Sequence, residues 1–227
     1  MKTLTLGLLL LGFATSTLAT DKVGLDNRVR SLTAKFEALQ QRTDLRVPAE
    51  HLRKAQGIIL LDRTKAGFIF AYQGGSGLAL VKDAKTEKWS PAAFLSASEA
   101  SLGFQVGGQQ SFLVILLMNT NATQRLLQAT IEFGGEARGT AGEVSSGQEG
   151  KVTNTADAVL VYADRKGLYG GAALKGGNIS PDNEANQIYY GQFLTAKDIL
   201  FDHKAKPTDS VTDFVKRLTE YSKESKK

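Results

Sequence analysis

The chain has 227 residues, 42% of them hydrophobic and 22% charged, a composition typical of one globular domain with enough apolar side chains for a core. The absence of cysteine excludes disulfide bonds and thiolate metal sites. The formal net charge of +5 is mild and lacks the dense Lys/Arg block of a nucleic-acid-binding protein, so we expect no nucleic-acid partner.

Residues 1–19 have the pattern of a cleaved export signal. Lys2 precedes an apolar run over residues 4–13, and residues 17–19 place small side chains where a signal peptidase cuts. The run is well short of the ~20 residues that a membrane-spanning helix needs, which argues against a retained anchor. We therefore expect a secreted or periplasmic protein after cleavage near Ala19, associated peripherally with a membrane.

Residues 20–50 are predicted to contain an amphipathic helix. Apolar residues recur at spacings of 4, 3, 4 and 3 and share one helical face: Leu25, Val29, Leu32, Phe36 and Leu39. The other face is basic, a pattern typical of helices that lie on a membrane interface. We predict that this helix contacts anionic lipid through Arg28, Arg30, Lys35, Phe36 and Arg42. The alternative is that its apolar stripe packs on the domain's own sheet.

A second short helix is expected to start at Pro48 and run through His51 to Lys54. Beyond it, short apolar runs between turn residues predict strands at 57–61, 68–72, 78–81, 94–98, 102–106 and 112–118. Residues 62–65 and 82–88 are predicted as polar turns, and Gly74-Gly75-Ser76-Gly77 as the connection of a hairpin. The most apolar run, 112–118, should lie at the centre of the sheet, buried on both faces.

The second half of the chain alternates between strand and helix signals. Residues 119–121 can cap a short helix, 130–153 should form one long strand and then a mobile loop, and 158–162 and 168–174 a strand pair. Residues 182–190 and 195–201 predict short helices. A C-terminal amphipathic helix from Val211 to Tyr221 should begin at Ser210, with Asp213 three residues later.

These elements predict an α+β fold in a single domain. We expect one strongly curved, mostly antiparallel sheet, with closure towards a barrel as a variant, flanked by N- and C-terminal helices. Residues 20–50 would form the N-terminal helical region, 51–201 the core and 202–227 the C-terminal helix.

The sequence contains no convincing motif for catalysis. Only His51 and His203 could act as imidazole bases, and Ser76 lacks the spacing of a nucleophile elbow. The alternating Asp182, Glu184 and Asn186 fail as a calcium loop, because its glycine and its final glutamate are missing. We therefore expect a non-enzymatic protein without a metal or another cofactor.

From about His51 to Phe201, seven short segments in order resemble the SYLF domain family. The matching positions include Lys65, Gly67, Gly74, Gly77, Trp89, Pro91, Phe94, Gly103, Gln105, Gly107 and Tyr190. The chain departs from the family pattern at Ala92, Phe112 and Gly142-Glu143. The resemblance implies a lipid-binding module: eukaryotic members bind phosphoinositide membranes, some also bind actin, and bacterial members are mostly exported.

The resemblance and the basic helix together predict an exported module that binds anionic phospholipid or phosphoinositide-like head groups at a membrane surface. Aromatic residues could add contacts at the sheet edge: Trp89, Phe94, Tyr169, Tyr189 and Tyr190. For Trp89 we favour a core position over a ligand contact. The alternative function is a non-catalytic envelope scaffold whose partner is another protein. An exported bacterial protein would meet no actin, so actin is not expected.

Overall fold

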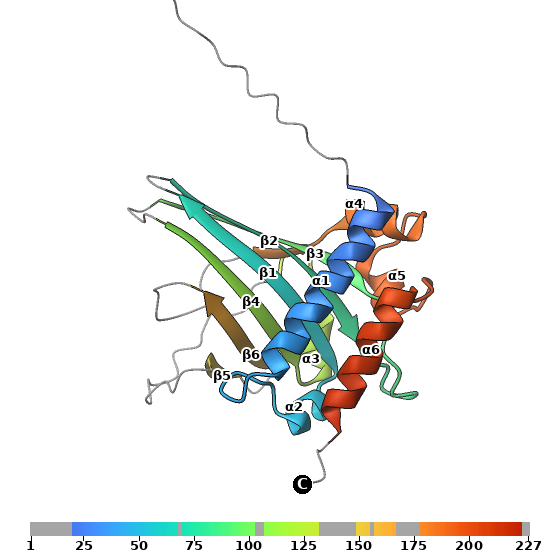
Figure 1. Ribbon diagram of the computed structural model, residues 1–227. Helices are drawn as coiled ribbons and strands as arrows, with labels where there is room; N and C mark the ends of the chain where they lie inside the picture. Colours follow the sequence, from blue (N-terminus) through green and yellow to red (C-terminus); the bar gives the residue numbers. More distant parts are fainter. Residues whose placement is uncertain are drawn as a thin grey trace, which may run out of the picture.

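The computed structural model describes residues 20–67, 70–102, 107–131, 149–154, 157–166 and 178–223, which form a twisted sheet with helices on both faces (Figure 1). The helices are α1 (Lys22–Gln40), α2 (Ala49–Lys54), α3 (Thr120–Gln124), the 3-10 turn η1 (Arg125–Leu127), α4 (Asn183–Tyr190), α5 (Ala196–Leu200) and α6 (Asp209–Ser222). The strands are β1 (Gly57–Gly67), β2 (Phe70–Val81), β3 (Ala93–Leu102), β4 (Gly107–Leu117), β5 (Glu149–Asn154), β6 (Asp157–Lys166) and β7 (Asn178–Pro181).

All neighbouring strands of the sheet are antiparallel, in the order β5-β6-β4-β1-β2-β3-β7. Within the described ranges β5 and β7 lie at opposite ends of this order, so the sheet is open. The prediction of a single α+β domain with an antiparallel sheet is confirmed, and the barrel-like variant is not what forms.

Successive residues of the central strands face two separate cores. Ile58 and Leu60 belong to the core beneath α1, α2, α4 and α6, whereas Ile59 and Leu61 belong to the core beneath α3, η1 and α5. Phe112 and the residues up to Leu117 alternate in the same way, and all are buried. The predicted burial of this run on both faces is therefore confirmed.

The predicted hairpin connection at Gly74–Gly77 is wrong, because these residues lie inside β2, and the predicted turn at 62–65 lies inside β1. The glycines serve close strand approach instead of a turn. A Cβ atom on Gly75 would lie 2.7 Å from the carbonyl oxygen of Asp62, and one on Gly77 would lie even closer to that of Leu60. Only glycine fits at such contacts.

Three predicted helix starts are confirmed. Asn119, Asp182 and Thr195 cap α3, α4 and α5 through side-chain oxygens that accept backbone N–H groups, and Asp21, which was not predicted as a cap, does the same for α1. The predicted start of the last helix is wrong by two residues, since Thr208 is the N-cap of α6.

Some predictions lie outside the described residues. They are the export signal at 1–19, the loop after the long strand, most of the strand at 102–106, and the strand at 168–174. Of the predicted long strand, Ile131 forms an isolated bridge with Ile179, whereas β5 takes up the end of the segment that was expected to form the loop.

Candidate functional site

The apolar stripe of α1 faces the protein core. Leu25, Val29, Leu32, Phe36 and Leu39 are all at most 2% exposed. The Phe36 ring packs edge to face on two rings of α6, with centroid distances of 5.7 Å to Phe214 and 5.8 Å to Tyr221. Insertion of Phe36 into a bilayer is not compatible with this packing. The alternative expectation, that the stripe covers the domain's own sheet, is the one that the structure bears out.

The predicted basic residues of α1 have acidic partners within the domain. Arg28, Lys35 and Arg42 follow one another at seven-residue intervals and therefore lie along one edge of the helix and the turn after it. They pair respectively with Asp182 next to β7 (Nη1 to Oδ2, 3.9 Å), Asp62 of β1, and Asp164 of β6 (Nη1 to Oδ1, 2.9 Å).

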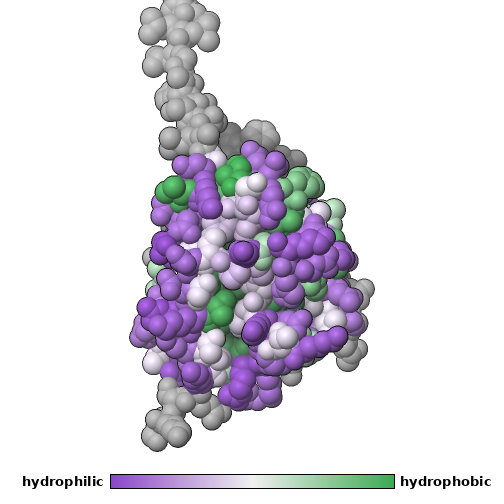
Figure 2. Space-filling model, turned by 90° about the vertical axis from the view of Figure 1, so that its right-hand side faces the viewer, coloured by the Kyte–Doolittle hydropathy of each residue, from purple (hydrophilic) through white to green (hydrophobic). Residues whose placement is uncertain are grey.

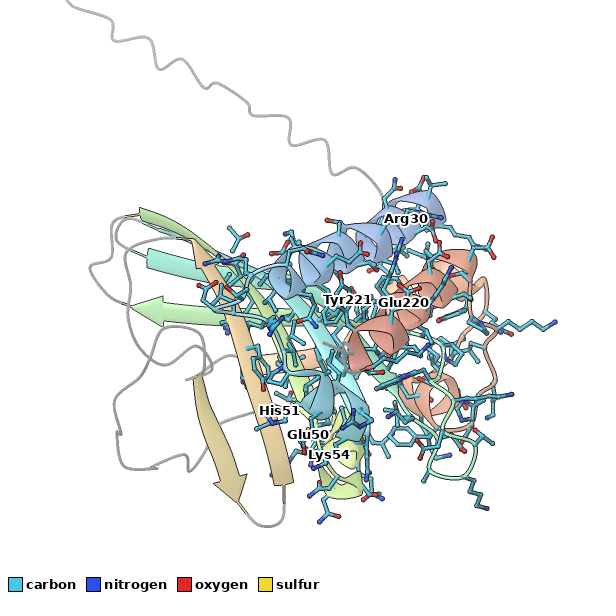
Figure 3. All side chains as sticks on the ribbon, turned by 60° about the horizontal axis from the view of Figure 1, so that its bottom comes forward. Arg30, Glu50, His51, Lys54, Glu220 and Tyr221 are labelled. Atoms are coloured by element: carbon cyan, nitrogen blue, oxygen red, sulfur yellow. The ribbon has the colours of Figure 1, made fainter. Side chains whose placement is uncertain are left out.

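Arg30, on another side of α1, pairs with Asp26 one turn earlier, at 2.9 Å. Figure 3 shows Arg30 on α1, with Glu220 and Tyr221 coming from α6 where the two helices run side by side. The structure thus places Arg28, Arg30 and Lys35 on α1 and Arg42 in the turn after it, and three of the four basic residues pair with acids on different strands or loops. Their contact with lipid stays a prediction, and any contact would compete with these ion pairs.

Arg28 has a further contact. Its guanidinium carbon lies 5.8 Å from the centre of the Phe94 ring, in cation–π geometry. Its Nη1 atom is buried and has no hydrogen-bond partner. The long ion pair with Asp182 is therefore the polar contact of this buried atom, while the Arg28 side chain as a whole remains 28% exposed.

The aromatic residues expected at the sheet edge belong mostly to the core. Tyr189 packs edge to face on both Phe94 (4.9 Å between centroids) and Tyr190 (5.2 Å). The Tyr190 hydroxyl donates to the carbonyl of Ala92 at 2.6 Å, and burial raises its pKa. Tyr169 lies outside the described residues.

Asp26 joins three helices through one carboxylate. Its Oδ1 accepts hydrogen bonds from the hydroxyls of Ser210 on α6 (2.5 Å) and Tyr189 on α4 (3.2 Å). The Ser210 hydroxyl is therefore used in a contact with α1. It does not cap α6, whose N-cap is Thr208.

Trp89 lies in the connection between β2 and β3, half-buried against the core beneath α6. Lys82 forms an isolated bridge with Trp89, and its Nζ lies 5.0 Å from the centre of the indole. Sequence reasoning missed this association, since residues 82–88 were interpreted only as a polar turn. The recurrence of lysine at 82, 85 and 88, directly before the one tryptophan, was the available signal.

The other positions of the resemblance mainly shape the fold. Gly67 and Gly107 pair across β1 and β4, Gly74 and Gly77 lie in β2, and Pro91 is buried where the chain enters β3. Lys65 lies at the end of β1, while Gly103 and Gln105 lie outside the described residues.

Within the described ranges no three His, Cys, Asp or Glu side chains are arranged to hold a metal ion. His51 contacts the Tyr162 hydroxyl through Nδ1, and burial raises the pKa of Tyr162 to about 12, whereas His203 lies 3.7 Å from Asp83. An open hollow of about 450 Å³ beside α3 is lined by amides, an arginine and a leucine: Asn121, Gln124, Arg125, Leu127 and Gln128.

The surface on the α6 side is mainly hydrophilic, with hydrophobic residues in small separate areas (Figure 2). Among the described residues the exposed large apolar side chains are Val23, Leu127 and Phe193. None of the helices in those ranges has the length and hydropathy required to span a membrane.

Comparison with known proteins places these features in a family. The model of the family described as "Ysc84: Las17-binding protein actin regulator" matches residues 98–221, more than half of the chain. The "SH3 domain-containing YSC84-like protein 1" of Bos taurus is 31% identical over 166 residues, which are 72% of this chain and 48% of the relative. The "LAS seventeen-binding protein 3" of Saccharomyces cerevisiae is 32% identical over 158 residues, 68% of this chain and 34% of the relative. The chain thus spans about half the length, or less, of these relatives. No solved structure matches it.

Proposed function

The chain belongs to the Ysc84 (SYLF) family, and we propose that it is a binding module that docks on anionic phospholipid membranes. The observation that carries the proposal is its excess of positive charge. The formal charge is +5, and exposed lysines such as Lys85, Lys206 and Lys216 have no carboxylate within 4.0 Å among the described residues. Each basic residue near an anionic bilayer contributes about 1 kcal/mol, so several such residues give weak, reversible docking.

Co-sedimentation with vesicles tests this proposal. One set consists of phosphatidylcholine alone, and the other also contains phosphatidylserine. We expect the protein to sediment with the anionic vesicles, and less so as the salt concentration rises, because salt screens charges at an exposed surface. Equal binding to both sets, or binding to neither, would contradict the proposal.

A protein partner is the second candidate, and the names of the relatives favour it. The family description names Las17 binding and actin regulation, and the yeast relative is called a LAS seventeen-binding protein. This chain would then act as a scaffold or protein-interaction domain. Co-sedimentation with purified actin filaments is a direct comparison: binding to filaments without binding to either vesicle set would favour this candidate.

The place of action is a separate proposal. We propose that residues 1–19 direct export and are removed near Ala19, so that the mature protein meets a membrane from an exported compartment. Mass spectrometry of the protein produced in a bacterial host tests this. A mature chain that begins near Thr20 and is found in the periplasm is expected, and an uncut cytoplasmic chain would contradict it.

A further inference from the structure

The connection between β2 and β3 contains a compact turn, residues 82–89, which we call the lysine turn. The backbone N–H of Asp83 donates to the carbonyl of Lys88 at 2.9 Å, and that of Glu87 donates to the carbonyl of Asp83 at 2.9 Å. Ser90 fastens the turn to the sheet, because its N–H donates to the Val81 carbonyl (2.8 Å) and its Oγ accepts from the Val81 N–H (3.0 Å). The turn is therefore held in one shape by its own backbone.

The acidic Asp83 is occupied inside the lysine turn. Its Oδ1 accepts hydrogen bonds from the N–H groups of Lys85 (3.0 Å) and Thr86 (2.7 Å) and from the Thr86 hydroxyl (2.9 Å). These bonds, above all the one from the Thr86 N–H, lower the pKa of Asp83. The carboxylate thus stabilises the turn and not the neighbouring ammonium groups.

The three lysines of this turn differ from Arg28, Arg30 and Lys35 of α1, which have acidic partners. In the part of the chain that the structure describes, Lys82, Lys85 and Lys88 have no carboxylate within 4.0 Å. The partners of Lys82 are uncharged: its Nζ lies over the indole of Trp89 and donates to the backbone carbonyl of Arg53 at 2.9 Å. Lys85 and Lys88 are exposed.

Partial burial of Lys82 lowers the pKa of its ammonium group. The Glu87 carboxylate acts in the opposite direction, but it lies farther away than the 4.0 Å of an ion pair. A partly desolvated ammonium without an adjacent carboxylate is stabilised by any anion that approaches from outside. The Trp89 indole beside it is half-buried against the core, so part of the ring stays accessible, and tryptophan is enriched at membrane interfaces.

We propose that the lysine turn is the surface through which this domain meets an anionic phospholipid bilayer. Lys82, Lys85 and Lys88 contact phosphate or carboxylate groups of the lipids, and Trp89 lies at the level of the head groups. The inference rests on the proposed function and names the surface that carries it. In Figure 1 the turn is the blue-green loop beside α6, at the opposite end of the domain from the first residues of α1.

The chain offers a direct optical test, because Trp89 is its only tryptophan. We expect its fluorescence emission to shift to shorter wavelength on addition of phosphatidylserine-containing vesicles and not of phosphatidylcholine vesicles. Brominated lipids in the anionic vesicles should quench this emission. If the protein sediments with anionic vesicles but the emission is neither shifted nor quenched, the turn is not the docking surface and the proposed function still stands.

Charge reversal in the turn provides the second arm. Lys85→Glu/Lys88→Glu should weaken binding to anionic vesicles about tenfold or more, since two attractive charges become repulsive. The matched control, Lys22→Glu/Arg30→Glu, makes the same change of charge on α1 and should alter binding about twofold or less. Melting curves followed by circular dichroism establish that both variants are folded.

The outcomes separate the alternatives. A loss of binding in the α1 control but not in the turn variant would assign docking to α1 and overturn the inference. Failure of the parent protein to bind any vesicle would overturn the proposed function together with it. Soluble polyglutamate is the remaining probe: if it shifts the Trp89 emission and anionic vesicles do not, the turn binds acidic polypeptide and the lipid assignment is wrong.

Discussion

Phe36 of α1 lies edge to face on Phe214 of α6, with their ring centres 5.7 Å apart, and both side chains are completely buried. The two rings come from opposite ends of the chain and close the same core. The contact therefore makes the N-terminal helix part of the folded domain, and removing it should be felt as a loss of stability.

Phe36→Ala should lower the free energy of unfolding by about 3 to 5 kcal/mol, as deletion of a large aromatic ring from a packed core does. Urea denaturation followed by circular dichroism measures this. Val23→Ala is the matched control, because Val23 lies on the same helix but is 66% exposed, and it should change little. A Phe36→Ala protein as stable as its parent would mean that α1 does not need the core.

Gly77→Ala should destabilise the β1–β2 pair. The added Cβ atom would collide with the backbone oxygen of Leu60, and relief requires the two strands to move apart. Overpacking of this kind costs about 1 to 3 kcal/mol, or more where backbone must shift. Ser76→Ala, at the adjacent position, is the control and should melt close to the parent. Equal melting temperatures for the two variants would argue against close strand approach.

Stability should fall in acid partly through Asp26. The Ser210 hydrogen bond, more than the ion pair with Arg30, lowers the pKa of Asp26 below the ordinary aspartate value of 3.8. A carboxyl whose pKa is lower in the folded state stabilises the fold above its unfolded pKa and loses that effect as pH falls through the folded pKa. The stability difference between the parent and Asp26→Asn should therefore be largest at neutral pH and shrink below 3.8.

Urea denaturation of both proteins across this pH range checks that expectation. Asp213→Asn serves as the control, since this aspartate is exposed on α6. A difference between parent and Asp26→Asn that stays constant down to the lowest pH would mean that the charge of Asp26 is not what the network requires.

The Lys35–Asp62 ion pair should contribute modestly. The two side chains are 39% and 33% exposed, so solvent screens their attraction, and pairs of this kind couple by about 0.2 to 1 kcal/mol. A double-mutant cycle with Lys35→Met and Asp62→Asn measures the coupling, which should decrease in high salt. A coupling that does not change with salt would show that the pair interacts through packing and not through charge.

The amphipathic helices could be predicted from local periodicity, because the spacing of Leu25 to Leu39 and of Val211 to Tyr221 depends only on each helix itself. The partners of the basic residues could not. Asp62, Asp164 and Asp182 are far apart in the sequence and meet α1 only because the strand order brings β1, β6 and the end of β7 under it.

Glycine misled the prediction of the hairpin for a similar reason. Gly75 and Gly77 carry the local signal of a turn, but their role is set by the backbone of β1, which the local sequence does not reveal. The polar residues of the lysine turn do predict a turn. That Lys82 lies beside Trp89 follows only from the backbone bridge between these two residues, which the local sequence does not indicate.

The pairing of α1 with α6 also bears on how the chain is made. During synthesis α1 leaves the ribosome well before the 14 residues of α6. Until α6 follows, Phe36 lacks the rings of Phe214 and Tyr221, and the part of the apolar stripe that α6 covers stays accessible. A chain cut short before α6 would keep that part exposed, so α6 is the segment that closes this side of the core.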